Sequence, residues 1–456
     1  MISLSLADIA RITGGNLHGD PDVPVNAPAA VDSRDIAGGG LFVALAGEHV
    51  DGHDFVAQAM AAGAAAVLAS RPVDAPAVIV DDVLAALAAL ARETTTRLKR
   101  DYGCIIVGVT GSQGKTSVKD LLAQVLAVAG PTIAAKGSFN NELGVPLTIL
   151  AADELTKYLI VEMGARGQGH IDRLCTIAQP DIGVVLNVGT AHVGEFGSTE
   201  HIAAAKGELV AALGAAGTAV LNADDPAVAA MRERTTANVI TFGASGDVLL
   251  SDVRVDDGGC PSFTLAYGDD SVDVSLAVLG YHQALNAAAV AAVGVSVGMS
   301  LGAICQALGA ARALSAMRME RSITADGVIV INDAYNANPE SMSAALRTLG
   351  RLGQGHGTYA VLGEMLELGE TSADAHAAIG ALAARLGITH VVVVGDGAAP
   401  IEAGVRGART PTAVTRVADV AAASELLKRL LKPGDVALIK ASRAGGLERV
   451  AAALLA

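Results

Sequence analysis

A glycine-rich loop between an expected strand and an expected helix gives the strongest chemical signal in the sequence. Residues 105–107 are Ile-Ile-Val, residues 108–116 read GVTGSQGKT, and an apolar helical pattern follows over residues 118–129. Backbone N–H groups of such a loop can surround phosphate oxygens at a helix N-terminus that favours anions. Lys115 would add a positive charge, and the Thr116 hydroxyl could bind Mg²⁺. The loop predicts a phosphate site at Gly111, Ser112, Gln113, Gly114, Lys115 and Thr116, with a plain glycine-rich turn as the alternative.

Two further expected strands end beside polar groups that could serve the same site. Glu162 lies near the end of the apolar run 158–163, and His192 follows the run 182–186 through the residues NVGTA. The carboxyl ends of parallel strands share one edge of a sheet, so both side chains could reach a phosphate-bound metal. Mg²⁺ prefers oxygen ligands, which would make His192 an unusual one. A structural role is the alternative for each residue.

Lys206 lies in an alanine-rich helical stretch, residues 201–209, whose composition is typical of a buried helix. A buried ammonium group is costly unless it is paired or chemically altered. The pattern alone favours an ordinary surface lysine, so a chemical role for Lys206 depends on the motifs around it.

Two polar runs follow later strands. Residues 332–342, NDAYNANPESM, leave an expected strand, break at Asn338-Pro339 and begin a helix, and residues 440–443, KASR, also follow a strand. Their amides, carboxylate and cations are positioned to bind a ligand at the edge of a sheet. A capping or turn role explains either run equally well.

The elements that must position these residues alternate along the chain. Apolar runs typical of strands alternate with helical patterns, which predicts βαβ units, mainly parallel sheets and an α/β fold class. Residues 1–99 have shorter strands and more turns, so we expect a separate α/β domain there. Residues 92–101 suggest a helix end and a linker, and another boundary is expected near residues 313–321. The expected strands lie at residues 104–109, 158–163, 182–186, 328–331, 359–362, 391–394 and 436–439.

Length and composition set further bounds. At roughly 150 residues per domain, 456 residues predict about three domains. The net charge of −15 comes without a basic stripe, which argues against a nucleic-acid partner. Four cysteines without a C-x-x-C pair argue against a zinc cluster and fit a reducing compartment. The first 14 residues have no basic segment before apolar ones, so we expect no secretory signal and a cytoplasmic protein.

Residues 274–311 contain no Asp, Glu, Lys or Arg and are long enough to span a membrane. His282, Asn286 and Gln306 interrupt the segment, and glycines and serines at residues 294–300 predict a turn. We therefore expect two buried alanine-rich helices and no membrane span.

Taken in order, these motifs resemble those of the Mur ligase family over nearly the whole chain. The loop at residues 108–116 is similar to the family form G-x-x-G-x-x-G-K-[ST], which accommodates Val109 where the strict phosphate-loop pattern has glycine. Glu162, the run that ends at His192, and Lys206 fall where the family has its central signatures. So do two further segments, NADD at residues 222–225 and GYHQALN at residues 280–286.

Within the family, four segments are similar to the member that adds D-alanyl-D-alanine. The tripeptide-forming member usually carries a D-x-x-H-x-P version of the run that begins at Asp333, and here Asn336 stands in place of the histidine. The four segments are residues 136–146, 333–342, 363–369 and 440–443.

The resemblance implies an ATP- and Mg²⁺-dependent ligase of peptidoglycan precursor synthesis. Residues 1–99 would bind the UDP-linked precursor, residues 100–314 would bind ATP, and residues 315–456 would form a Rossmann-like domain for the incoming dipeptide. The substrates would be UDP-N-acetylmuramoyl-tripeptide and D-alanyl-D-alanine, joined through an acyl phosphate. We expect a monomer.

The resemblance also implies roles for single residues. The catalytic group comprises Lys115, Lys206 and His192, and the metal ligands comprise Thr116, Glu162, His192 and a carbamylated Lys206. Asn336 and Asn338 would contact the adenosine part across a domain interface. Further nucleotide contacts come from Asn286, Asn332 and Asp333, and substrate contacts come from Ser33, Arg34, Asn140 and Asn141.

Three other interpretations stay open at this point. A sister ligase that adds a single amino acid would differ in the amine pocket alone. A regulatory nucleotide-binding protein would have kept the loop without the chemistry, which the joint presence of Glu162, His192 and Lys206 disfavours. A plain phosphate-loop kinase is disfavoured because two further domains would have no role.

Overall fold

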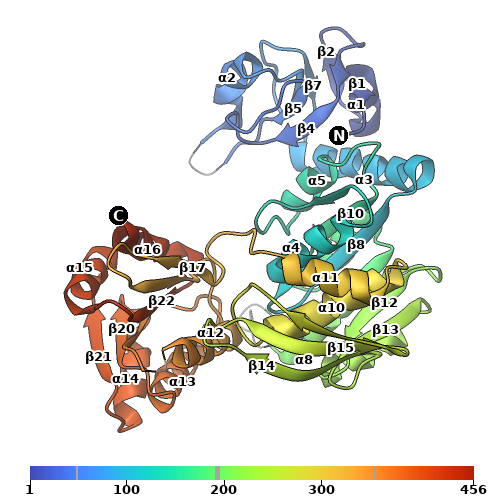
Figure 1. Cartoon of the computed structure of the whole chain (residues 1–456). Coiled ribbons are helices and arrows are strands. Elements are labelled where there is room, and N and C mark those ends of the chain that lie inside the picture. The colour runs from blue at the N-terminus through green and yellow to red at the C-terminus, as the bar shows by residue number, and fades with distance from the viewer. Residues whose placement is uncertain (48–49, 190–195, 354) are drawn as a thin grey trace.

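The computed structural model describes residues 1–47, 50–189, 196–353 and 355–456 (Figure 1). Its described strands form four sheets in three successive lobes, and their alternation with helices confirms the predicted α/β fold class. We name these the N-terminal, central and C-terminal lobes, after the main sheets at residues 16–79, 105–275 and 320–440. The domain limits at residues 99/100 and 314/315 remain a proposal.

The N-terminal lobe is built on a small, mainly parallel sheet. Its elements are β1 (Leu4–Ser5), α1 (Leu6–Thr13), β2 (Asn16–His18), β3 (Pro24–Val25), β4 (Ala27–Ala30), β5 (Gly40–Val43), η1 (Gly52–Phe55), α2 (Val56–Ala61), β6 (Ala66–Ala69) and β7 (Ala77–Ile79). The sheet order is β2-β7-β6-β5-β4, with β2 antiparallel to β7, and β1 pairs with β3 apart from it. Strands β5 and β6 are fully buried apolar runs, as parallel strands covered on both faces require.

The central lobe contains a nine-stranded sheet. Its strands are β8 (Ile105–Thr110), β9 (Thr132–Ala134), β10 (Tyr158–Glu162), β11 (Ile182–Val185), β12 (Thr218–Asn222), β13 (Asn238–Gly243), β14 (Val248–Val255), β15 (Pro261–Tyr267) and β16 (Asp270–Ser275). Its helices are α4 (Lys115–Ala127), α5 (Gly144–Ile149), α6 (His170–Ala178), α8 (Thr199–Ala211), α9 (Pro226–Ala229), η2 (Ala230–Arg234), α10 (Gln283–Ser296) and α11 (Leu301–Ala310). The order is β16-β15-β14-β13-β12-β11-β8-β10-β9, with β15 and β16 as an antiparallel edge.

Alternate side chains of the central strands enter different cores. Ile106 of β8 belongs to a cluster with residues of α6, whereas Val107 belongs to one with α4 and α10. Successive strand residues point to opposite faces, so helices cover the sheet on both sides. This explains why the strands read as uninterrupted apolar runs in the sequence.

The C-terminal lobe contains a third mainly parallel sheet, which is covered by helices. Its elements are β17 (Glu320–Ile323), β18 (Ile329–Asn332), α12 (Pro339–Leu352), β19 (Thr358–Leu362), η3 (Gly369–Thr371), α13 (Ser372–Arg385), β20 (His390–Val394), α14 (Ala399–Gly407), β21 (Ala413–Val417), α15 (Val420–Leu430), β22 (Val436–Lys440), η4 (Arg443–Gly445) and α16 (Glu448–Leu455). The order is β17-β18-β22-β19-β20-β21, in which β17 pairs antiparallel with β18.

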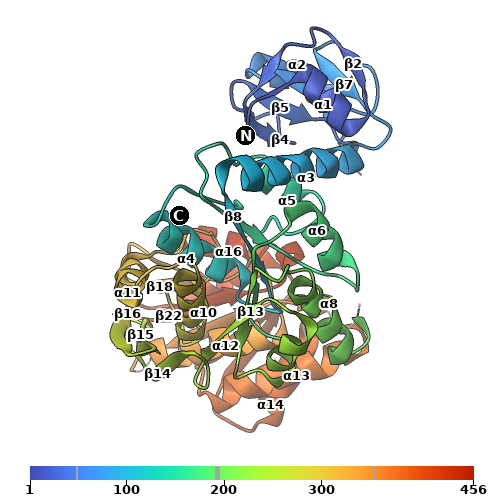
Figure 2. The same ribbon diagram turned by 90° about the vertical axis from the view of Figure 1, so that its right-hand side faces the viewer.

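Helix α3 (Val83–Tyr102) joins the first two lobes, and it corrects the predicted linker at residues 92–101. Asp82 caps its start by accepting the Ala85 N–H at 3.0 Å, and Gly103 ends it in the left-handed conformation. The threonine-rich part stays helical because Thr94 and Thr95 are buried on one face of the helix. Figure 2 shows α3 lying between the N-terminal lobe and helices α5 and α6.

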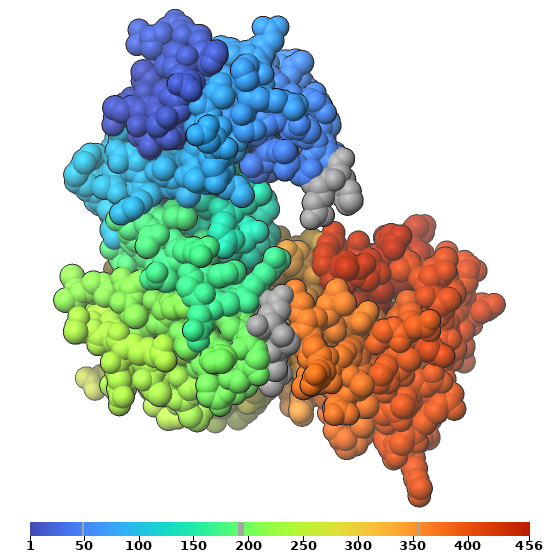
Figure 3. Space-filling model, turned by 180° about the vertical axis from the view of Figure 1, so that it is seen from behind, coloured from blue at the N-terminus to red at the C-terminus, as the bar shows by residue number. Residues whose placement is uncertain are grey.

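The uncharged segment at residues 274–311 folds as expected into the end of β16 and the two helices α10 and α11. Among the described residues, none of the helices is long and apolar enough to cross a membrane. After α11, residues 312–319 form neither helix nor strand and lead into the C-terminal lobe. Figure 3 shows the N-terminal and C-terminal lobes standing apart beside the central lobe.

Candidate active site

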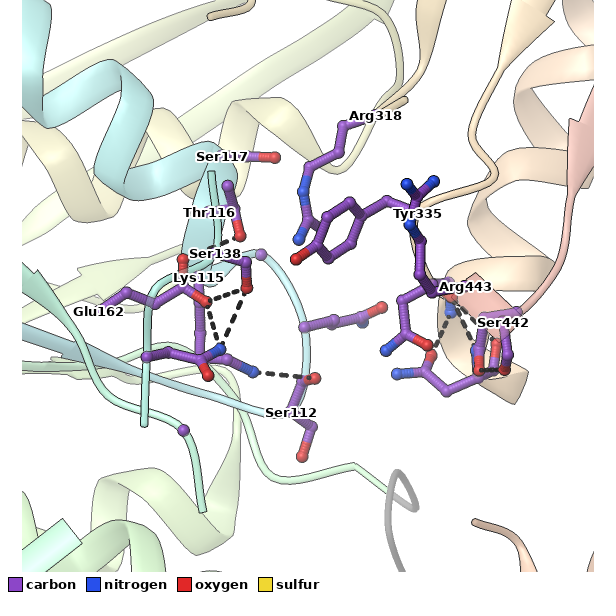
Figure 4. A pocket seen from close by; sticks show the side chains of 18 of the residues that line it. Ser112, Lys115, Thr116, Ser117, Ser138, Glu162, Arg318, Tyr335, Ser442 and Arg443 are labelled. Atoms are coloured by element: carbon purple, nitrogen blue, oxygen red, sulfur yellow. Dashed lines mark hydrogen bonds between the residues drawn. The ribbon is translucent and has the colours of Figure 1, made fainter. Parts of the chain in front are cut away.

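A cavity of about 610 Å³ lies between the central and C-terminal lobes. The central lobe contributes the phosphate loop, the end of β10 and the start of α10, and the C-terminal lobe contributes the ends of β18 and β22. Figure 4 shows Lys115 and Glu162 on one wall. Tyr335 and Arg443 stand on the opposite wall. The cavity therefore lies at the carboxyl ends of parallel strands, where open α/β sheets bind ligands.

The phosphate loop has the predicted strand–loop–helix setting between β8 and α4. Gly114 has a φ of +82°, and a Cβ there would come within 2.8 Å of Asn286 Oδ1, so glycine is required. The Gln113 N–H donates to Asn187 Oδ1 at 3.0 Å, which fixes the loop to the strand end beside it. Lys115 Nζ donates to the Gly111 carbonyl at 2.6 Å. These contacts set the shape of the loop and the position of its lysine.

Glu162 is buried beside the end of the loop. Its Oε2 accepts the Thr116 hydroxyl at 2.8 Å, and its Oε1 accepts Ser138 Oγ at 3.1 Å and Asn140 Nδ2 at 2.9 Å. The side chains of Thr116, Ser138, Asn140 and Glu162 come from three separate segments and meet there. The side chains of Thr116, Ser138 and Glu162 present oxygen atoms at this point. Hydroxyl and carboxylate oxygens are the donors that Mg²⁺ prefers.

Lys206, on α8, is 6% exposed and lines the same cavity. Burial lowers the pKa of Lys206 well below its usual value, and the nearby charge of Lys115 lowers it further. The neutral form of this amine is therefore favoured relative to that of an exposed lysine. Sequence reasoning alone favoured a surface lysine, and burial makes the chemical interpretation stronger. His192, predicted as a metal ligand, lies outside the described residues.

An ion pair organises the C-terminal wall. Lys440 Nζ bonds to Asp333 Oδ2 at 2.6 Å and also donates to the Asn336 carbonyl at 2.8 Å. Asp333 Oδ1 accepts the Met319 N–H at 3.1 Å. The Asp333 and Lys440 side chains are 14% and 3% exposed, so the pair is poorly screened, and it ties the loop after β18 to the end of β22.

The predicted nucleotide-binding asparagines fall into different positions. Asn336 is exposed in the cavity, whereas Asn338 Oδ1 caps α12 by accepting the Ser341 N–H at 2.8 Å. Asn286 lines the cavity and donates to Gln283. Asn332 is not among the lining residues, and its Oδ1 accepts the Ala334 N–H at 3.3 Å. The structure therefore brings three of these four asparagines to the cavity.

Comparisons with known proteins identify the family. Three family models match in order: "Mur ligase family, catalytic domain" at residues 30–95, "Mur ligase middle domain" at residues 109–294, and "Mur ligase, glutamate ligase domain" at residues 317–443. The chain belongs to the Mur ligase family.

Relatives of this Mur ligase match it over nearly their whole length. The UDP-N-acetylmuramoyl-tripeptide--D-alanyl-D-alanine ligase of Mycobacterium tuberculosis is 47% identical over 502 residues, which cover 100% of this chain and 98% of the relative. The Escherichia coli ligase of the same name is 35% identical and covers 100% and 99%. MurF from Acinetobacter baumannii has a TM-score of 0.87 at 31% identity over 99% of both chains. MurF ligase from Thermotoga maritima in complex with ADP has a TM-score of 0.79 at 31% identity over 94% and 97%.

The residues predicted to bind the substrates of this Mur ligase lie in two places. Asn140 and Asn141 line the cavity, and Asn141 Oδ1 also accepts the N–H of Gly144, the first residue of α5, at 2.9 Å. Ser33 and Arg34 lie in the N-terminal lobe and do not line this cavity. Arg34 is exposed, and its guanidinium is held by Asp32 at 2.6 Å.

Arg318 is a cavity residue of this Mur ligase that sequence reasoning missed. It lies in the coil after α11, and its guanidinium stands 4.2 Å from the centre of the Tyr335 ring. Burial lowers the pKa of Lys115. The negative charge of Glu162 raises this pKa, and the positive charge of Arg318 lowers it. No periodic pattern marks a residue in such a coil. An arginine in an interdomain segment was the one available signal.

Proposed function

We propose that this Mur ligase joins D-alanyl-D-alanine to UDP-N-acetylmuramoyl-tripeptide and converts ATP to ADP and phosphate. The observation that carries the proposal is the cavity in which a complete phosphate loop faces the polar wall of a second lobe. Full-length similarity to ligases of that name supports the choice of substrates. We also propose that the enzyme acts in the cytoplasm as a monomer.

The proposed reaction has two steps. An oxygen of the tripeptide's terminal carboxylate attacks the γ-phosphorus of ATP, and ADP leaves, which gives an acyl phosphate. The amine of D-alanyl-D-alanine then attacks the acyl carbon, phosphate leaves, and the nitrogen loses a proton to give the amide. Phosphoryl transfer depends mainly on positioning and on charge stabilisation, which fits the residue types in the cavity.

Each wall has a part in this reaction. Lys115 and Arg318 would stabilise charge on the transferring phosphoryl group, whereas Asn336 and Asn338 would contact the adenosine part from the C-terminal lobe. Asn140 and Asn141 would orient the peptide end of the precursor. The uridine end would bind far from the chemistry, at Ser33 and Arg34 of the N-terminal lobe.

The residues around Glu162 fit a Mg²⁺ ion that the reaction would use. Thr116 and Glu162 offer hydroxyl and carboxylate oxygens at the phosphate loop, and His192 is proposed as a further ligand. Lys206, if carbamylated, would present an anionic oxygen ligand in place of its amine. Bound Mg²⁺ would neutralise charge on the phosphates.

A comparison of acceptors tests the proposal. Purified enzyme with ATP, Mg²⁺ and UDP-N-acetylmuramoyl-tripeptide should release phosphate when D-alanyl-D-alanine is added and far less with single amino acids. Equal release with one amino acid would favour a sister ligase. Nucleotide binding without acceptor-dependent release would favour a regulatory protein.

A further inference from the structure

Two buried charges lie on α4 one turn beyond the phosphate loop, and the chemistry proposed above does not use them. Lys119 and Asp120 are 2% and 7% exposed and form an ion pair of 2.7 Å. Lys119 Nζ also donates to the carbonyl oxygens of Ala135 at 2.7 Å and Gly137 at 2.9 Å. These three acceptors match the three N–H donors of an ammonium group. Lys119 therefore fixes the start of the loop that carries Asn140.

The Asp120 carboxylate reaches the linker between the central and C-terminal lobes. Its Oδ2 accepts the Ser315 N–H at 2.9 Å, and its Oδ1 accepts the Ser315 hydroxyl at 3.1 Å. One turn further along α4, Gln124 exchanges two hydrogen bonds of 2.9 Å with the backbone of Arg312. Asp120 and Gln124 share a face of α4 because they are four residues apart. That face holds residues 312–315 on the phosphate-loop helix.

The C-terminal lobe holds the linker from the other side. The Met317 carbonyl accepts the Tyr335 N–H at 3.2 Å, and the Met319 N–H donates to Asp333 Oδ1 at 3.1 Å. Met317 and Met319 have φ angles of 58° and 50°, in the left-handed region that side chains of this size rarely adopt. Such a backbone persists where its surroundings fix it. The attachments on both sides of Arg318 therefore decide its direction.

Arg318 projects from this doubly held backbone into the cavity, toward Tyr335 and the phosphate loop (Figure 4). We infer that Asp120 is a positioning residue for phosphoryl transfer, because by fixing Ser315 it aims Arg318 at the nucleotide phosphates. The inference rests on the proposed ligase function. The phosphate loop by itself does not require the buried ion pair of Lys119 and Asp120, and the inference gives this pair a role.

Replacement of Asp120 by asparagine keeps the size of the side chain and changes its chemistry. One acceptor oxygen becomes an NH₂ group, so either the Lys119 ammonium or a Ser315 donor faces another donor. Lys119 also remains buried without its carboxylate, which is unfavourable. The linker at Ser315 should loosen, and Arg318 should lose its direction while every group that touches substrate keeps its chemical type.

Steady-state phosphate release by the full-length enzyme tests the inference. We expect Asp120→Asn to lower kcat about tenfold or more and to change KM for the UDP precursor less than about twofold, because orientation and not precursor binding is lost. Arg318→Ala should lower kcat on the order of 10²-fold. In the Arg318→Ala background, Asp120→Asn should have less than about a twofold further effect, because no guanidinium is left to aim.

Asp247→Asn is a control for the loss of the same kind of hydrogen bonds at an exposed carboxylate. Asp247 Oδ2 likewise accepts the N–H and the hydroxyl of one residue, Thr241, at 2.8 and 2.7 Å, but it lies before β14 and away from the linker. The kcat of the Asp247→Asn enzyme should equal that of the wild type. If Asp120→Asn does not fold, Ser315→Ala takes its place in the test, because it removes one hydrogen bond and leaves the Lys119–Asp120 ion pair intact. We expect Ser315→Ala to lower kcat less than Asp120→Asn would, and we expect this loss to vanish in the Arg318→Ala background.

Two results would overturn the inference. One is an unchanged kcat in the folded Asp120→Asn enzyme, or in Ser315→Ala where that variant decides. The other is an equal loss of kcat with and without Arg318, which would show a general effect on the fold. A wild-type enzyme that releases no acceptor-dependent phosphate would instead contradict the proposed function.

Discussion

The Thr116 hydroxyl, at the start of α4, donates a hydrogen bond of 2.8 Å to Oε2 of Glu162 at the end of β10. The parallel pairing of β10 with β8 places Glu162 opposite Val109, so the carboxylate and the end of the phosphate loop have a spacing that the sheet itself sets. Thr116 at the end of the loop and Glu162 at the end of the strand would both hold a Mg²⁺ ion. The metal and phosphate sites are therefore expected to respond together to mutation.

Glu162→Gln should raise the Mg²⁺ concentration needed for half-maximal activity. The amide keeps one oxygen but loses the negative charge, and we expect a shift on the order of tenfold or more, since even changes outside the ligand shell typically cost that much. Phosphate release measured over a Mg²⁺ titration checks this. Thr116→Ser, which keeps the hydroxyl, is the control. A Glu162→Gln enzyme with wild-type Mg²⁺ dependence would remove Glu162 from the proposed ligands.

Lys115→Ala should abolish turnover and leave the fold intact. The side chain lies at the cavity and its Nζ bonds to a loop carbonyl, so its loss removes charge at the phosphates without opening the core. The expected loss of kcat is on the order of 10²-fold or more. Phosphate release and the circular dichroism spectrum should be measured on one preparation. Near-normal turnover in a folded variant would refute the phosphate-site assignment.

Asn336→Ala should mainly weaken the binding of ATP. Asn336 is exposed in the cavity, and no hydrogen bond of its side chain is among the described contacts. Asn338 caps a helix, so its replacement would also affect the fold. KM for ATP should rise with little change in KM for D-alanyl-D-alanine. Affinity must be measured in turnover, because the lobes are expected to close around the nucleotide. An unchanged KM for ATP would contradict the predicted adenosine contact.

Lys206→Ala should be nearly inactive and should regain part of its activity with acetate or formate. Burial lowers the pKa of Lys206 and so favours its neutral amine, and a neutral amine can add CO₂ to form a carbamate. Small carboxylates could occupy the space that the carbamate would fill. Activity with and without added formate is the measurement, and chloride at the same ionic strength is the control. Full activity of the unrescued variant would exclude this role.

The parts of the fold that depend on a local sequence pattern could be predicted from the sequence. Each of the seven expected strands coincides with a strand of the central or C-terminal sheet, because fully buried parallel strands read as continuous apolar runs. The antiparallel edge formed by β14, β15 and β16 was missed because most residues of β14 and β16 are exposed or half-buried, so these strands carry no continuous apolar run. The predicted end of helix α3 was too early, because a polar, threonine-rich stretch resembles a linker when its burial is unknown.

The site was predictable to a similar extent. The phosphate loop, Glu162 and the run after Asp333 carry their chemistry in adjacent residues, so motifs reveal them. Asp120 and Ser315 are 195 positions apart, and their contact exists through the tertiary fold alone. The roles of Ser33, Arg34 and His192 and the limits of the domains stay predictions.

The most direct test of the central claim uses UDP-N-acetylmuramoyl-tripeptide with ¹⁸O in both oxygens of its terminal carboxylate. In the proposed reaction one carboxylate oxygen bonds to the γ-phosphorus and leaves with it when the amine of D-alanyl-D-alanine attacks. Mass spectrometry should therefore find one ¹⁸O atom in each phosphate released and one in each newly formed amide carbonyl. Product amide accompanied by unlabelled phosphate, or by AMP and pyrophosphate, would contradict ligation through an acyl phosphate.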